Sequence, residues 1–462
     1  MPAGTLDTGA VARLLAQVAD QPEDRAEAYF ERRRERSIPP EGEASLPAEL
    51  VEEGFAVRLV RDGRCWHASR DGVDSASFVE ALRQVARAQP RTAWVEPELA
   101  VPVAPARASL DAAEEPAEAG AAGWDTPGVA FSDPPPWRDF CRRVEHAIRA
   151  HHVAFPNRLA LRQIERTVQV VGARLVPEVE RESFFSVQAE LPWGRCGALL
   201  WTLDEAAAET LGNRLVGLFR ARFAEPPEVR RGVLVLGPDA AAVLLHEAVA
   251  HALEADLLAL SGRPEAALGV RLGAACLNVL DDPGAAPAAV RRTSDDEGSP
   301  VLRRWLLRDG VVEQPLADGI WADRSLALQP GAARRAHRHV LPGPRSSYLE
   351  LLPGETAMSD LLHGSDSGLY VPELSRGALD PLSGVFTLLA PYARRLEGGE
   401  IGDYVGPCRV RAAVFDLLTR VTALGLETQA AGAGWCAKGG QALPVWARSP
   451  AMRIEGVEVL PV

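Results

Sequence analysis

A segment in the middle of the chain combines histidine and carboxylate side chains in a pattern that suits metal-dependent hydrolysis. Residues 232–258 begin with an apolar run that predicts a buried strand, and a Gly-Pro pair ends this run. A segment rich in Ala, Val and Leu follows and predicts a helix, which contains His246, Glu247 and His251. Polar side chains in an apolar helix are costly unless they have partners. The sequence therefore predicts a functional site in this helix.

The spacing of the two histidines constrains the shape of that helix. The familiar zinc-protease helix has its histidines four residues apart on one face, whereas His246 and His251 are five residues apart. At roughly 100° per residue, an ideal helix would separate the two side chains by about 140°. Both can bind one metal ion only if the helix is bent, bulged or ends near Ala250. The alternative is that they are ordinary core or surface histidines.

A second candidate part of the site lies near the carboxyl end of the chain. Residues 432–441, GAGWCAKGGQ, are dense in glycine and predict a loop that presents Cys436 and approaches a ligand closely. Lys438 is the only lysine among the 50 lysine and arginine residues of the chain. A lysine at this one position indicates that the site needs a compact ammonium group. The alternative is that the lysine falls here by chance.

These motifs resemble those of one family. HEAVAHALEAD, from His246, and GWCAKGGQ, from Gly434, are similar to motifs of the TldD/PmbA metallopeptidases, a family also called "modulator of DNA gyrase". Ala250, Ala255 and Tyr348 depart from its more usual glycines and asparagine. The resemblance is fainter in the N-terminal half. In the C-terminal half it extends through TSDDEGSP (293–300), PRSSYLELLPG (344–354), GLYVPELSRGALDPLSGVF (368–386) and LEGGEIGDYVG (396–406).

The resemblance implies a zinc-dependent peptidase with one Zn²⁺ ion per active subunit. It assigns His246, His251 and Cys436 as metal ligands and Glu247 as the general base. Three protein ligands with a fourth position left for water are typical of catalytic zinc, and the metal makes that water acidic. Glu254 as the third ligand, in place of Cys436, is the alternative.

Other polar residues are candidates for supporting or substrate-binding roles. Glu254 and Asp256 either orient a ligand histidine or are exposed acids, and Lys438 belongs to the same candidate group. Asp296 and Glu297 lie in an acidic run that is typical of a solvated turn, but their match to the family's DDEG segment predicts a role at the cleft. The arginine-rich stretch 334–339 predicts either a solvated loop or a loop that clamps substrate.

The surrounding elements predict an α+β fold. Few strands alternate with helices, which disfavours a doubly wound parallel sheet. We expect an N-terminal domain of mixed helices and strands, and a largely antiparallel β C-terminal domain that carries the metal-binding helix. The expected parts are an N-terminal hairpin and helix (1–98), a linker-like segment rich in Ala, Pro, Glu and Gly (99–136), the remainder of the N-terminal domain (137–226) and the metallopeptidase domain (227–462).

Periodicity and turn signals predict individual elements. Residues 7–36 predict a helix that ends in a charged, solvated stretch. The Asp62-Gly63 pair predicts a hairpin over 54–69. A capping box at Thr202 and Glu205 predicts a helix to about residue 223, and another helix is predicted at about 410–424.

Composition excludes several functions. The net charge of −13 without a basic block argues against direct nucleic-acid binding. No apolar run is long enough to span a bilayer, and no signal peptide is visible. Six scattered cysteines indicate a reduced, cytoplasmic protein.

The family resemblance also implies partners. It implies unfolded or flexible peptides as substrates, held as extended strands, and either a homodimer or a heterodimer with a related TldE/PmbA-like subunit. Two alternatives remain open. One is a non-catalytic peptide-binding subunit with a structural metal, and the other is a metal-dependent amidohydrolase for a small molecule.

Overall fold

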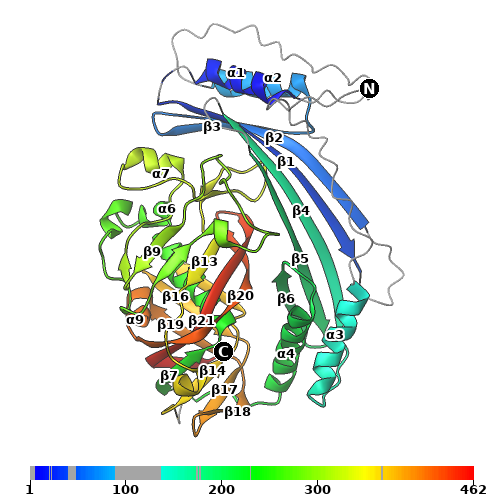
Figure 1. Ribbon diagram of the computed structural model, residues 1–462, viewed down its shortest axis with the longest axis vertical. Helices are drawn as coiled ribbons and strands as arrows, with labels where there is room; N and C mark the ends of the chain where they lie inside the picture. The colour runs from blue at the N-terminus through cyan, green and yellow to red at the C-terminus, as the bar shows by residue number, and fades with distance from the viewer. Residues whose placement is uncertain are drawn as a thin grey trace, which may run out of the picture.

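The computed structural model describes residues 6–39 except 20 and 22, 48–88, 137–228 except 173, 174, 176 and 177, and 230–462 except 366 and 367. The linker expected at 99–136 lies outside the described residues. Two large β-sheets organise the chain, and the long curved N-terminal sheet runs along one flank of the C-terminal part (Figure 1).

The N-terminal sheet is antiparallel throughout, with strand order β3-β2-β1-β4-β5-β6. Segments on both sides of the expected linker contribute to it, because β1 pairs with both β2 and β4. Helices α1 and α2 cover one end, and α3 and α4 pack against the other (Figure 1). The elements are α1 (Thr8–Val18), β1 (Arg25–Ile38), β2 (Ala48–Arg61), β3 (Arg64–Asp71), α2 (Ser75–Arg87), α3 (Trp137–Ala150), β4 (Arg158–Gly172), β5 (Val179–Leu191), β6 (Gly194–Leu200) and α4 (Glu205–Ala221).

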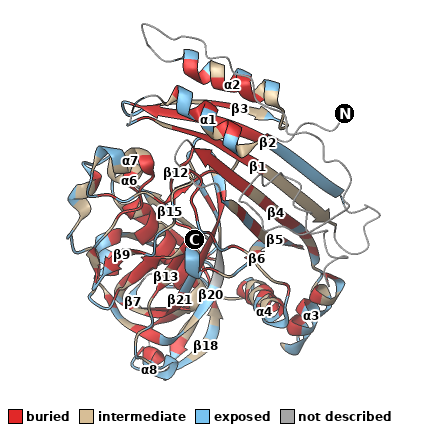
Figure 2. Cartoon of the chain, turned by 45° about the horizontal axis from the view of Figure 1, so that its top comes forward, coloured by how far each residue is buried: buried red, intermediate tan, exposed pale blue. Residues whose placement is uncertain are grey.

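The helix predicted over residues 7–36 is wrong beyond Val18, because Arg25–Ile38 forms the interior strand β1. The charged stretch is matched across the sheet, with Arg32 opposite Glu53, and such opposite-charge pairs stabilise strands. Tertiary pairing therefore outweighs local helix propensity. Strand β2 is exposed over its first six residues and buried beyond them (Figure 2). The predicted hairpin at Asp62-Gly63 is confirmed between β2 and β3. The helix predicted up to about residue 223 is also confirmed and runs from Glu205 to Ala221, but its N-cap is Asp204 and not Thr202 of the predicted capping box.

The C-terminal part is built on a mixed sheet of thirteen strands within the described residues, in which most pairs are antiparallel. The exceptions are the parallel pairs β7–β14 and β13–β21. The α+β prediction is thus confirmed. The strands are β7 (Arg230–Leu236), β8 (Val279–Asp281), β9 (Arg304–Arg308), β10 (Val311–Val312), β13 (Tyr348–Leu351), β14 (Leu369–Val371), β15 (Arg376–Asp380), β16 (Val385–Ala390), β17 (Ala393–Glu397), β18 (Glu400–Val405), β19 (Cys408–Ala413), β20 (Val421–Lys438) and β21 (Gln441–Pro461); β11 (Ala333–Arg334) pairs separately with β12 (Gly343–Pro344).

Two local predictions in this part are wrong. The helix expected at about 410–424 is limited to α9 (Val414–Leu418), because buried Cys408 and Val410 alternate with exposed arginines in a strand that pairs with β16. The glycine-dense segment is the end of strand β20 and its turn into β21, not a loop. Cys436 is therefore held in a hydrogen-bonded ladder.

Helix α5 (Pro238–Leu245) follows β7 directly and packs against β20 and β21 in the largest apolar core of the described residues. Shorter helices lie around the sheet, and none in the described part of the chain is long and apolar enough to cross a membrane. They are α6 (Ala255–Leu258), α7 (Gly319–Arg324) and α8 (Met358–Leu362).

Buried ion pairs join the N-terminal sheet to the C-terminal part. Arg58 of β2 contacts Glu297 at 2.5 Å, and Arg335 contacts Glu27 of β1 at 2.9 Å. All four side chains are at most 8 % exposed. Buried charges of this kind are tolerated only when they are paired and hydrogen-bonded, so the network fixes how the two parts face each other.

Candidate metal centre

The helix that carries the two histidines changes its winding at the first of them. α5 passes into a π-turn, His246–Ala250, and then into a 3₁₀ turn, His251–Leu253. The His251 amide donates to the His246 carbonyl, an i→i+5 bond that defines the π-turn. As a result the two imidazole centroids are 4.5 Å apart, with their planes at 68°. The bulge is the distortion that a five-residue spacing requires.

Cys436, near the carboxyl end of the chain, lies next to this histidine pair. Its sulfur lies 3.3 Å from His251 Nε2. One ligand atom from each of His246, His251 and Cys436 lies within 4.8 Å of the other two, and all three residues are buried. Ser346 Oγ contacts His246 Nδ1 at 3.4 Å, and Arg345 donates to the Cys436 sulfur at 3.2 Å. The arginine places positive charge next to the sulfur.

The three residues fit a transition-metal ion. His246 Nε2 is buried and has no hydrogen-bond partner among the described residues. Such an orphaned nitrogen costs free energy unless something binds it. Two imidazole nitrogens and one thiolate sulfur form a donor set that suits zinc. The His246, His251 and Cys436 group therefore has suitable donor atoms for a metal ion, and one of them, His246 Nε2, has no other described partner.

A second set of contacts fixes the orientation of His251. Its Nδ1 lies 2.9 Å from Glu254 Oε2, which leaves Nε2 facing Cys436. Lys438 Nζ donates to Glu254 at 2.7 Å, to Asp256 at 2.7 Å and to the Pro344 carbonyl at 3.2 Å. Three acceptors match the three N–H groups of an ammonium, which the planar guanidinium of arginine would not reproduce. This geometry gives Glu254 an orienting position and favours Cys436 as the third ligand.

Burial and neighbouring charges shift the pKa values of the site in opposite directions. Burial, followed by His251, lowers the pKa of His246 to about 3, so its ring is neutral at pH 7. Burial alone would lower the pKa of His251, but Glu254 and Cys436 outweigh it and raise that pKa to about 10. Burial opposes ionisation of Glu254, yet His251 and Lys438 bring its pKa down to about 2. The raised pKa of His251 and the lowered pKa of Glu254 both favour a charged pair in the absence of a metal ion.

Glu247 lies between the metal centre and strand β15. Its side chain packs against Gly377, where an added Cβ would lie 2.2 Å from Glu247 Cγ. Glycine is therefore needed for β15 to run so close. Burial raises the pKa of Glu247, as Glu254 does more weakly, while His251 opposes the shift. A carboxylate with a raised pKa is better matched to general-base work near neutral pH.

Comparisons with known proteins agree with this geometry. Residues 230–460 match the sequence profile described as "PmbA/TldA metallopeptidase C-terminal domain". The chain belongs to the PmbA/TldD metallopeptidase family. It is 29 % identical to a metalloprotease TldD homologue of Haemophilus influenzae over 49 % of this chain and 47 % of the relative. A metalloprotease of Methanothermobacter thermautotrophicus is 29 % identical over 56 % of this chain and 55 % of the relative.

The sequence match covers about half the length of these curated relatives of the PmbA/TldD family. The fold likeness covers much more. The crystal structure of TldE from Thermococcus kodakarensis superposes with a TM-score of 0.68 at 19 % identity, over 97 % of this chain and 99 % of that one. At this identity the likeness shows a shared fold.

Two of the candidate residues in this PmbA/TldD protein lie elsewhere. Asp296 and Glu297 do not form a solvated turn and are engaged in the buried network between the two sheets. Asp296 contacts Arg292 at 2.6 Å, and Glu297 accepts from Arg58 and from the Gly319 amide. Both carboxylates therefore help to join the two sheets.

The arginine-rich stretch 334–339 is not the solvated loop that is one of the two expectations. Arg334, Arg335 and Arg338 are buried, and His339 contacts Asp71 of β3 at 3.1 Å. This stretch joins the two parts of the molecule and is not a free loop.

Three contributors to the site were not singled out from the sequence. Arg345, Ser346 and Gly377 contact Cys436, His246 and Glu247 respectively. All three lie in segments that carry the family resemblance, PRSSYLELLPG and GLYVPELSRGALDPLSGVF. That resemblance was the only available signal, because none of these residue types indicates a site by itself.

Proposed function

We propose that this protein is a zinc-dependent peptidase that hydrolyses unfolded or flexible peptides. In this proposal His246, His251 and Cys436 hold one Zn²⁺ ion and Glu247 is the general base. The observation that carries the proposal is the convergence of three buried ligand atoms within 4.8 Å beside a partly buried carboxylate. Metalloprotease relatives support the same reaction class.

The chain's own residues divide the work of hydrolysis. A bound zinc ion supplies a Lewis acid for the scissile carbonyl and makes the attacking water acidic. Glu247 accepts the proton from that water and delivers it to the departing amine. Glu254 and Lys438 hold the His251 ring in position, as carboxylates commonly do for zinc-binding histidines.

Strand β15 supports a peptide as substrate. It pairs with β16 along one edge, and no other described strand pairs with it. An extended peptide can add to such an edge through backbone hydrogen bonds, which depend little on its sequence. Since Gly377 of β15 lies against Glu247, a peptide beside this strand would pass the metal centre.

The likeness to TldE supports a two-subunit assembly, either a homodimer or a heterodimer with a TldE/PmbA-like chain. Size-exclusion chromatography with light scattering, on the protein alone and mixed with such a chain, distinguishes the two. A monomer under both conditions would contradict this part of the proposal.

The main test compares the protein with its Glu247→Gln variant on unfolded peptides, with products identified by mass spectrometry. We expect the wild type to cleave the peptides. Cleavage should stop when a chelator removes the metal and should return when Zn²⁺ is added. The variant should keep the metal and lose at least about 100-fold in kcat, the scale of general-base catalysis. Glu400→Gln, an exposed glutamate of β18, is the matched control.

The alternatives give different results in the same test. Metal retention without cleavage of any substrate would indicate a peptide-binding subunit. Cleavage of small amides but not of peptides would indicate an amidohydrolase. Full activity of Glu247→Gln would remove Glu247 from the mechanism.

A further inference from the structure

Alternate residues of β15 lead from the general base to a cavity. Residues two apart in a strand share one face and lie about 6.6 Å apart. Gly377 lies against Glu247, and Leu379, two residues further on, lines a cavity of about 330 Å³. His251 lines the same cavity. The space therefore begins at the metal centre and continues along the strand proposed to hold the substrate.

The chemistry of this cavity is apolar. It is lined by Leu258 of α6, Leu272, Leu379, and Val414 and Phe415 of α9. Among the described residues no Asp, Glu, Lys or Arg lines it, and His251 and two serines are its polar members. Phe415 is 56 % exposed and stands at the rim. An apolar space of this size with few polar groups is the usual form of a side-chain binding pocket.

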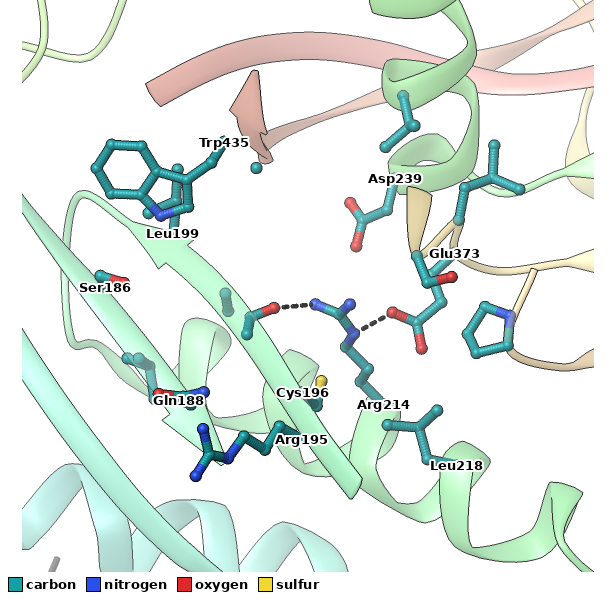
Figure 3. Close-up of a pocket in the computed structure, with 18 of the residues that line it drawn as sticks. Ser186, Gln188, Arg195, Cys196, Leu199, Arg214, Leu218, Asp239, Glu373 and Trp435 are labelled. Atoms are coloured by element: carbon teal, nitrogen blue, oxygen red, sulfur yellow. Dashed lines mark hydrogen bonds and ion pairs between the residues drawn. The ribbon is translucent and has the colours of Figure 1, made fainter. Parts of the chain in front are cut away.

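The cavity near the other end of β15 differs in character (Figure 3). It is lined by Ser375, which precedes β15, and by Asp239, Glu373 and Arg214. Arg214 is paired with Glu373 and donates to the Gly197 carbonyl at 2.8 Å. A large apolar side chain placed there would cover charged groups without replacing their hydrogen bonds, which is unfavourable. The two ends of β15 therefore lie beside cavities of different chemistry.

We propose that the cavity bounded by His251, Leu379 and Phe415 is a specificity subsite. It accepts a large aliphatic or aromatic side chain of the peptide on one side of the scissile bond. The inference rests on the proposed function and adds a selectivity that backbone pairing with an edge strand does not supply. Because an apolar pocket gives graded discrimination, we expect a preference of roughly ten- to a hundredfold in kcat/KM over a polar residue at that position.

The test uses the full chain with zinc and a mixture of synthetic peptides, and mass spectrometry assigns each cut. We expect Leu, Phe or Met to be enriched at a single position next to the cut. Phe415→Asp places a carboxylate at the rim and should reduce this enrichment at least about fivefold, whereas Phe415→Leu should preserve it. Phe223→Asp is the matched control, since Phe223 is 74 % exposed at the end of α4.

Binding separates this inference from the proposed function. Fluorescence anisotropy with the Glu247→Gln protein compares labelled peptides that differ only in Leu or Asp at the variable position. We expect tighter binding of the leucine peptide, and loss of the difference in Glu247→Gln/Phe415→Asp. Equal affinities, or a cleavage preference that Phe415→Asp leaves unchanged, would overturn the subsite. Failure of the wild type to cleave would count against the peptidase proposal alone, because the binding comparison still tests the cavity.

Discussion

At the scale of single residues, Cys436 is the decisive ligand in the proposed set. It is the donor that joins the carboxyl-terminal hairpin to the histidine pair. We expect Cys436→Ala to lower zinc affinity at least about 100-fold, because two imidazoles alone leave the ion without its thiolate. Inductively coupled plasma mass spectrometry after dialysis measures the zinc content. Cys408→Ala, at another buried free cysteine, should keep one zinc per chain. Full zinc content in Cys436→Ala would instead favour Glu254 as the third ligand.

The single lysine gives a second prediction at this scale. Lys438 holds Glu254 and Asp256 together, and Glu254 in turn orients His251. Removing such an outer partner typically costs 10–100-fold in metal affinity. We expect about that loss for Lys438→Met and a smaller loss for Lys438→Arg, which keeps the charge but not the tripod of donors. Competition with a zinc-binding dye measures both. Equal affinity of Lys438→Arg and wild type would show that charge alone matters.

At the scale of elements, the site depends on how closely β15 approaches the π-turn. In Gly377→Ala the new Cβ would overlap Glu247 Cγ, so the carboxylate or the strand must move. Misplacement by about 1 Å is costly for catalysis, and we expect kcat to fall at least about tenfold with zinc content unchanged. Peptide cleavage assays and metal analysis measure the two quantities. In Gly402→Ala the nearest atoms to the new Cβ are 3.5 Å away, so activity should be retained. An unchanged kcat in Gly377→Ala would show that Glu247 is free to adjust.

The same elements show what the sequence alone can predict. The local spacing of His246, Glu247 and His251 makes them candidates, and helix geometry predicts the distortion that the π-turn provides. The motif around Cys436 makes it a candidate, but its glycines predict a loop, whereas the residue lies in strand β20. In the structure the register shifts between Gly432 and Gly434, where a bulge in β20 accommodates them. The burial of Glu297 was not predictable from local sequence, since its partner Arg58 is 239 residues away.

At the scale of the whole molecule, buried charges of both sheets and the loops between them hold the parts together. Glu182 of β5 is 7 % exposed and contacts three arginines: Arg292 at 3.1 Å, Arg334 at 3.2 Å and Arg166 at 3.4 Å. Burial alone would raise the pKa of Glu182, but these arginines outweigh it and lower the pKa to about 2. An acid with a folded-state pKa below its unfolded value near 4.3 stabilises the fold above that unfolded value. Its contribution is lost as the pH falls toward about 2.

We therefore expect the urea midpoint of unfolding to decrease steadily from about pH 5 to pH 3, because over this range the unfolded chain takes up protons at Glu182 and Asp296 while the folded protein, which lowers the pKa of both, keeps them ionised. Tryptophan fluorescence in urea at each pH measures the midpoint. Glu182→Gln should be less stable at pH 7, because three buried arginines lose the negative charge that they contact. It should also depend less on pH in this range than the wild type. Glu190→Gln, on the same strand but paired at the surface with Arg195, should follow the wild-type curve. Parallel curves for Glu182→Gln and wild type would show that this contact does not couple proton uptake to the joining of the two sheets.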